Sequence, residues 1–129
     1  MIEGSQPVFF PAGDWFVAFL LTLAIEVPVA TLLLRRDEPN LLRAAALVVF
    51  ANLVTHPLVW YVWSQVFLIG TPQYVIAAEA WAILAEAVFY AVVIRGIRPG
   101  RALLVAAVAN VASFAVGRLV TQLWPEVFR

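Results

Sequence analysis

Two carboxylates stand in the middle of long apolar stretches, and a carboxamide follows each of them. Glu26 precedes Asn52, and Glu86 precedes Asn110. A charge at the centre of a membrane helix costs about 2.5–3.5 kcal/mol on insertion scales, so such residues usually meet partners or a water-filled path. Two carboxylates that interact titrate as a coupled pair, which can hold a proton or release it and take a cation. The pattern therefore predicts one buried site that binds protons or ions.

The carboxamides also have a simpler interpretation. Polar side chains hold membrane helices together through hydrogen bonds, at about 0.6 kcal/mol on average. For Asn52 and Asn110 we favour this packing role. For Glu26 and Glu86 we favour the binding role, because Gln would join two helices at a much lower cost.

The one His of the chain, His56, lies one helical turn after Asn52 on the same face, and Thr55 is its neighbour. Its imidazole could relay protons or bind a metal together with the Glu residues. Alternatively, it is a neutral His bonded to a backbone carbonyl or to Glu79. The sequence leaves both interpretations open, and it leaves any metal unidentified. The Glu-x-x-His spacing of di-iron bundles is absent, which argues against a dinuclear iron site.

A second set of polar residues surrounds these five: Thr55, Glu79, Tyr90, Ser113 and Arg118. Glu79, Glu86 and Tyr90 share one helix face. Glu79 and Arg118 are expected at a similar depth, so we expect them to form an ion pair. The alternative is that Glu79 marks the outer mouth of a path to Glu86. Ser113 fits a stripe of small residues that lets its helix pack closely.

The composition places the chain in lipid. Hydrophobic residues make up 64% of its 129 residues, more than a soluble fold of this size could cover. The formal net charge is zero, which gives no support to a nucleic-acid partner. Cys is absent, so disulfides and thiolate metal sites are excluded, and no cofactor is indicated. The segment 1–5 lacks the basic region of a signal peptide, so we expect the first apolar stretch to be retained as a helix.

Four apolar stretches have about the 20 residues that a helix needs to cross a bilayer. They are 15–34, 41–63, 74–94 and 102–124. The sequence therefore predicts an all-α integral membrane protein, a bundle of four transmembrane helices in a single domain over 1–129. Charged, Pro-containing connections at 35–40 and 95–101 separate the first pair and the last pair. The connection 64–73 is uncharged, and either lies in the membrane interface or folds back into the protein.

The sequence also predicts an internal repeat of two similar helical hairpins, over about 15–63 and about 74–124. The polar residues of the first copy are Glu26, Arg35, Arg43, Asn52 and Thr55, and those of the second are Glu86, Arg95, Arg101, Asn110 and Ser113. Both hairpins have the same orientation. We therefore expect a parallel repeat whose pseudo-twofold axis runs along the membrane normal.

The Arg residues predict the orientation. All basic residues are Arg, and most of them flank the connections 35–40 and 95–101. The positive-inside rule places these two connections in the cytoplasm and both termini outside, and we expect a bacterial or archaeal inner membrane. Aromatic residues mark the opposite ends of the helices, as in an interfacial belt. They are Trp15, Trp60, Trp63, Tyr74 and Trp124.

The stretch Leu23–Val27, which contains Glu26, resembles the first helix of small multidrug-resistance transporters. In that family one embedded Glu exchanges protons for cationic drugs. The second Glu, the His and the hairpin repeat depart from the family's pattern, so its function is not carried over to this chain.

Three functions fit these residues. The first is cation- or proton-coupled transport or conduction, with Glu26 and Glu86 binding the ion, Asn52 and Asn110 orienting them, and His56 relaying protons. Because four helices enclose little volume, we then expect a homodimer. The second is an accessory or assembly subunit of a larger membrane complex, whose polar residues specify packing only. The third, least favoured, is an intramembrane enzyme in which a Glu activates water and the His assists.

Overall fold

The computed structural model describes residues 12–128, and their regular structure is entirely helical. Four long helices, one short helix and a final 3-10 turn follow one another along the chain. They are α1 (Ala12–Leu34), α2 (Leu41–Tyr61), α3 (Trp63–Val66), α4 (Pro72–Val93), α5 (Pro99–Leu123) and η1 (Pro125–Phe128). Each long helix is apolar and long enough to cross a membrane. The predicted helical class with four membrane-length helices is therefore confirmed.

Local sequence signals explain where these helices begin. The side chain of Asn40 accepts a hydrogen bond from the backbone N–H of Arg43 over 3.0 Å at the start of α2. Thr71 does the same for Tyr74 over 3.3 Å at the start of α4. Pro stands at the first positions of α4 and α5, where its missing N–H has no cost. Both helices therefore begin a few residues earlier than the apolar stretches indicated.

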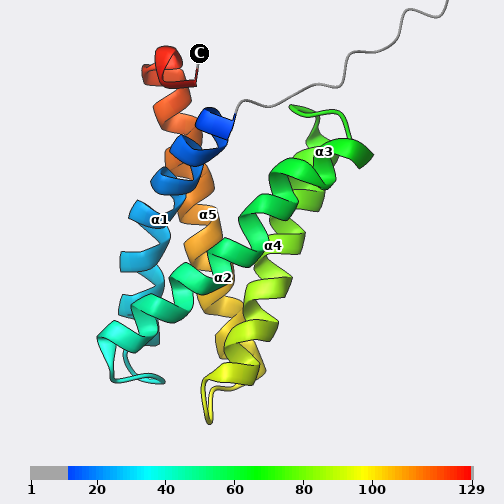
Figure 1. Ribbon diagram of the computed structural model, residues 1–129. Helices are drawn as coiled ribbons and strands as arrows, with labels where there is room; N and C mark the ends of the chain where they lie inside the picture. Colours follow the sequence, from blue (N-terminus) through cyan, green and yellow to red (C-terminus); the bar gives the residue numbers. More distant parts are fainter. Residues whose placement is uncertain (1–11, 129) are drawn as a thin grey trace, which may run out of the picture.

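The middle connection does not fold back among the helices. The chain turns at the end of α2 and forms α3, and Figure 1 shows this segment beyond the ends of α2 and α4. Val66 is 61% exposed and Leu68 is 79% exposed. Of the two arrangements that the sequence left open, the one inside the protein is excluded.

The four long helices form a bundle in which sequence neighbours run antiparallel (Figure 1). α1 packs on α2 and α5, and α4 packs on α2 and α5, so α1 and α4 occupy opposite corners. The start of α1, the end of α5 and the α2–α4 connection lie at one end of the bundle. We call it the cavity end, after the cavity described below. The connections 35–40 and 94–98 lie at the other, which we call the Arg-rich end.

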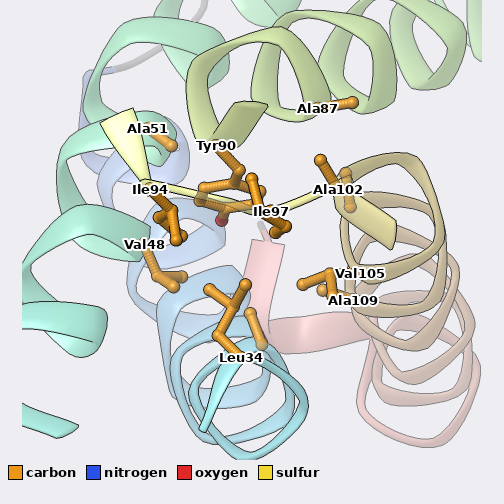
Figure 2. Packing of buried hydrophobic residues seen from close by; sticks show 12 residues of the cluster. Leu34, Val48, Ala51, Ala87, Tyr90, Ile94, Ile97, Ala102, Val105 and Ala109 are labelled. Atoms are coloured by element: carbon orange, nitrogen blue, oxygen red, sulfur yellow. The ribbon is translucent and has the colours of Figure 1, made fainter. Parts of the chain in front are cut away.

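Buried apolar side chains fill the half of the bundle toward the Arg-rich end. We call this cluster the apolar seal; it consists of Ala30, Leu34, Val48, Ala51, Ala87, Tyr90, Ile94, Ile97, Ala102, Val105, Ala106 and Ala109. Figure 2 shows side chains from all four long helices and from the α4–α5 connection meeting there. The many Ala residues allow the helix backbones to approach closely. Large apolar side chains also cover the outside of the bundle, as lipid contact requires.

Arg101 fastens the Arg-rich end. Its guanidinium lies 3.2 Å from the carboxylate of Asp37 and also donates to the backbone carbonyl of Leu33. The first bond joins α5 to the α1–α2 connection, and the second satisfies a carbonyl in the last turn of α1. Arg43 pairs with Glu38 over 3.1 Å nearby. In the stretch 12–128 these two are the ion pairs, and both lie at this end.

Candidate functional site

The two carboxylates and two carboxamides singled out in the sequence form one buried layer. Glu26 and Glu86 are each 1% exposed, Asn52 is 2% exposed and Asn110 is 5% exposed. The layer sits where the apolar seal ends, so the four residues lie between the seal and the cavity end. Glu26 and Glu86 border the same cavity.

Each carboxamide binds the carboxylate of the helix that precedes it in the chain, on α1 for Asn52 and on α4 for Asn110. Asn52 Nδ2 donates to Glu26 Oε2 over 2.9 Å, and Asn110 Nδ2 donates to Glu86 Oε2 over 2.7 Å. The same nitrogens also donate to backbone carbonyls one turn earlier, that of Val48 over 3.1 Å and that of Ala106 over 2.9 Å. Only the NH₂ group can face a carbonyl oxygen, so these backbone contacts fix which way each amide points.

Each carboxylate also contacts a hydroxyl from one further helix. Ser113 Oγ of α5 lies 2.6 Å from Glu26 Oε1 of α1. Thr55 Oγ1 of α2 lies 3.1 Å from Glu86 Oε1 of α4. The carboxylates are therefore joined to two helices each, and the polar layer links all four. The sequence placed Thr55 and Ser113 near the site but did not indicate these exchanged partners.

A cavity of about 440 Å³ opens from this layer toward the cavity end. Each long helix contributes to its wall, with residues on the side of the Glu–Asn layer opposite to the apolar seal. Its polar lining consists of Asp14, Thr22, Glu26, Asn52, Thr55, His56, Trp60, Glu79, Glu86, Asn110, Ser113, Arg118 and Thr121. The bundle is thus hollow in one half, where polar and apolar side chains border the cavity, and packed and apolar in the other.

The charges of the cavity favour a cation. Four carboxylates line it, those of Asp14, Glu26, Glu79 and Glu86, against the single guanidinium of Arg118. A cleft lined by one sign of charge concentrates ions of the opposite sign. Over residues 12–128, no group of three or more His, Asp or Glu side chains is arranged to hold a metal ion.

The ion pair expected between Glu79 and Arg118 is wrong. Neither residue belongs to the ion pairs formed within the described chain. Both side chains instead border the cavity, where solvent can satisfy each charge separately. The alternative interpretation, in which Glu79 lines the way to Glu86, agrees with this position.

His56 lies on the cavity wall among aromatic rings. Its ring centroid is 5.3 Å from that of Phe19 and 6.1 Å from that of Trp15. Its Nε2 lies 3.4 Å from the hydroxyl of Thr22 on α1, and its Nδ1 has no partner among the described residues, so neither partner of the alternative interpretation, a backbone carbonyl or Glu79, is bonded to the ring. Sequence reasoning missed Thr22, although it precedes Glu26 by one turn and therefore shares its helix face.

Tyr90 lies in the apolar seal rather than in the cavity. It is 0% exposed, and Figure 2 shows it among Ile94, Ile97 and other apolar side chains. Its hydroxyl has no hydrogen-bond partner among the described residues. Such a group is costly in an apolar interior.

Comparison with models of protein families, with curated proteins and with solved structures found no match for this chain. The class of protein is therefore defined by its own structure: a bundle of four apolar, membrane-length helices with a buried layer of Glu and Asn residues.

Proposed function

We propose that the protein is a small cation- or proton-coupled membrane transporter whose binding site is the pair Glu26 and Glu86. One observation carries the proposal: the two buried carboxylates close the inner end of a cavity that opens at one end of the bundle. Packing alone requires no such cavity. An ion path does, because an ion must reach its site from water.

The apolar seal gives this proposal a mechanism. In the described conformation it separates the Glu–Asn layer from the Arg-rich end, so an ion reaches the carboxylates from the cavity end only. Transport then requires a second conformation in which the seal opens and the cavity closes. Rocking of one hairpin against the other around a fixed site is the usual way to achieve this.

The hairpin repeat and the orientation are parts of the same proposal. The hydrogen bonds support a repeat over about 15–63 and 74–124, because the Glu26, Asn52 and Ser113 set matches the Glu86, Asn110 and Thr55 set bond for bond. With the Arg-rich connections in the cytoplasm of a bacterial or archaeal cell, the cavity opens to the outside. A homodimer stays a prediction; the cavity itself lies within one chain.

An accessory subunit of a membrane complex is the alternative. The observation that favours it is the full hydrogen bonding of both carboxylates, which also suits side chains that only specify packing. The two functions differ in what protonation does. A transport site changes its protonation or its ion during use, whereas a packing element does not need to.

The test is the pH dependence of the melting temperature, for the wild type and for a Glu26→Gln/Glu86→Gln double variant. Gln is nearly isosteric with a neutral carboxyl group. We therefore expect the wild-type melting temperature to vary with pH, and to approach that of the double variant as the pH falls and the carboxyls take up protons. A cation that binds the site should stabilise the wild type alone.

Glu126→Gln is the matched control, because Glu126 is an exposed carboxylate outside the bundle's polar layer. It should keep the wild-type pH dependence and the wild-type response to cations. If wild type and double variant instead melt alike at every pH and with every cation, the carboxylates are packing elements and the transport proposal fails.

A further inference from the structure

Thr55 and Ser113 each stand between two acceptors. Thr55 Oγ1 lies 3.1 Å from the backbone carbonyl of Ala51 and 3.1 Å from Glu86 Oε1. Ser113 Oγ lies 3.0 Å from the backbone carbonyl of Asn110 and 2.6 Å from Glu26 Oε1. A hydroxyl has a single proton to donate but two lone pairs that accept. Each hydroxyl can therefore donate to only one of its two neighbours at a time.

The carboxamides leave one carboxyl oxygen for a proton. Asn52 directs one N–H to Val48 and the other to Glu26 Oε2, so this oxygen always accepts. Asn110 does the same for Glu86 Oε2 with its contact to Ala106. A proton on either Glu must then reside on Oε1, which is the oxygen that faces the hydroxyl.

We propose that Glu26 and Glu86 are proton-binding sites, each protonated on Oε1, and that the hydroxyls of Ser113 and Thr55 reverse direction when the proton arrives. In the ionised state, the hydroxyl donates to the carboxylate. In the protonated state, the carboxyl O–H donates to the hydroxyl oxygen, and the hydroxyl donates to the backbone carbonyl behind it. Every group is satisfied in both states without moving a heavy atom.

This inference rests on the proposed function and narrows its ligand to the proton. Both hydroxyls line the cavity, so a proton from cavity water can reach Oε1 directly. Taking it up converts a carboxylate and a hydronium ion into a carboxylic acid and water, with no other reactant. Because Glu26 and Glu86 each have such a hydroxyl partner, the two carboxyl groups can take up two protons in two coupled steps.

Other charged and titratable groups act on the same site from the helices around it. Those lining the cavity or facing the two carboxylates are Asp14 of α1, His56 of α2, Glu79 and Tyr90 of α4, and Arg118 of α5. These groups are the same in the wild type and in variants of the hydroxyls. A difference between those proteins therefore reports on the hydroxyl itself.

Infrared difference spectroscopy of the purified protein tests the proposal, because the C=O stretch of a protonated carboxyl is separate from the carboxylate bands. The spectrum is recorded during a titration between about pH 5 and pH 9. Thr55→Val and Ser113→Ala remove the hydroxyls, and Thr55→Ser and Ser113→Thr restore them. Thr31→Val is the matched control, since the Thr31 hydroxyl lies outside the cavity lining and has no hydrogen-bond partner among the described residues.

We expect a carboxyl band in the wild type that is absent from the Glu26→Gln/Glu86→Gln double variant. In Thr55→Val the band of Glu86 should rise at a pH about one unit higher, a tenfold change in proton affinity, because the carboxylate loses its charge-assisted bond. Thr55→Ser and Thr31→Val should match the wild type. Ser113→Ala should repeat the result at Glu26, so the test survives if one variant fails to fold.

Two results would overturn the inference, and they are distinguishable. A band that titrates in the wild type but stays unchanged in Thr55→Val and Ser113→Ala shows that the hydroxyls only bond their own helices, while the proposed function stands. A wild type with no titrating band from Glu26 and Glu86 removes the proton as the ligand. If no cation stabilises the wild type either, the proposed function fails with it.

Discussion

Ser113 of α5 contacts Glu26 of α1 over 2.6 Å, and this bond joins the last long helix to the first. Thr55 of α2 makes the corresponding bond to Glu86 of α4. The bonds from the carboxamides stay within each pair of consecutive helices, whereas those from the hydroxyls cross between the pairs. A change in either carboxylate therefore alters a hydrogen bond between the α1–α2 pair and the α4–α5 pair.

Asn52 and Asn110 should contribute equally to the stability of the protein. Asn52→Leu leaves Glu26 Oε2 and the Val48 carbonyl without their donor, and Asn110→Leu does the same to Glu86 Oε2 and its backbone carbonyl. We expect each variant to lower the free energy of unfolding by about 1–3 kcal/mol. Denaturation in detergent micelles measures it.

A double-mutant cycle decides whether that loss comes from the carboxylate. Combining Asn52→Leu with Glu26→Gln should show a coupling energy of about 0.5–3 kcal/mol, because the two side chains are in direct contact. Combining Asn52→Leu with Glu126→Gln should be additive. Additivity in both cycles would mean that the carboxamide acts on its own helix only.

Cys residues placed on α5 should react with thiol reagents faster on the cavity side of Asn110 than on the side of the apolar seal. The chain has no Cys, so single-Cys variants report without background. Gly117 lines the cavity, and a Cβ added there meets nothing within 4 Å. Ala106 is 0% exposed within the apolar seal. We expect Gly117→Cys to react with a polar maleimide faster than Ala106→Cys by about tenfold or more, since reactivity depends on access. Equal rates would contradict a cavity that is closed at the Glu–Asn layer.

Removing the hydroxyl of Tyr90 should stabilise the protein. The group is fully buried among apolar side chains and has no partner within the described part of the chain. Tyr90→Phe keeps the ring and is expected to raise the free energy of unfolding by about 1 kcal/mol. Tyr61→Phe, at a residue 43% exposed, should have little effect. A loss of stability in Tyr90→Phe would show that the hydroxyl is bonded.

The ion pair between Arg101 and Asp37 should make a small contribution to the stability of the protein. The Arg101 and Asp37 side chains are 30% and 19% exposed, so solvent weakens their attraction. Arg101→Gln should lower the free energy of unfolding by about 1 kcal/mol, and less at high salt. Arg95→Gln, at an exposed Arg outside the described ion pairs, is the control. A cost that does not change with salt would assign the effect to the bond with the Leu33 carbonyl.

The lengths of the apolar stretches and the Pro-containing connections between them were sufficient to predict the four long helices. Asn40, Thr71 and Pro99 are local signals, and each marks a helix start that the structure shows. Depth along a helix follows from counting residues, so the common level of Glu26 and Glu86 can be predicted from their positions in the chain. The sequence did not show how far each helix is rotated about its own axis.

That rotation decides the contacts that sequence reasoning missed. Which hydroxyl meets Glu86, and whether His56 faces Thr22 or Glu79, depends on how the helices cross and not on spacing along one of them. The Glu79–Arg118 pair failed for the same reason, since equal depth does not make two side chains neighbours. The cavity depends on all four helices diverging in one half of the bundle, which no single stretch of sequence encodes.

The unequal halves of the bundle also determine where a membrane voltage acts. Under the proposed function, water that fills the cavity would carry the electrical potential of the solution at the cavity end inward to Glu26 and Glu86, so most of the voltage would fall across the apolar seal. A charge that crosses the seal then experiences about 2.3 kcal/mol per 100 mV over only half of the bilayer thickness. Under the proposed function, the electric field would be focused on a short apolar barrier, and proton movement between Glu26, Glu86 and the Arg-rich end would be the voltage-sensitive step.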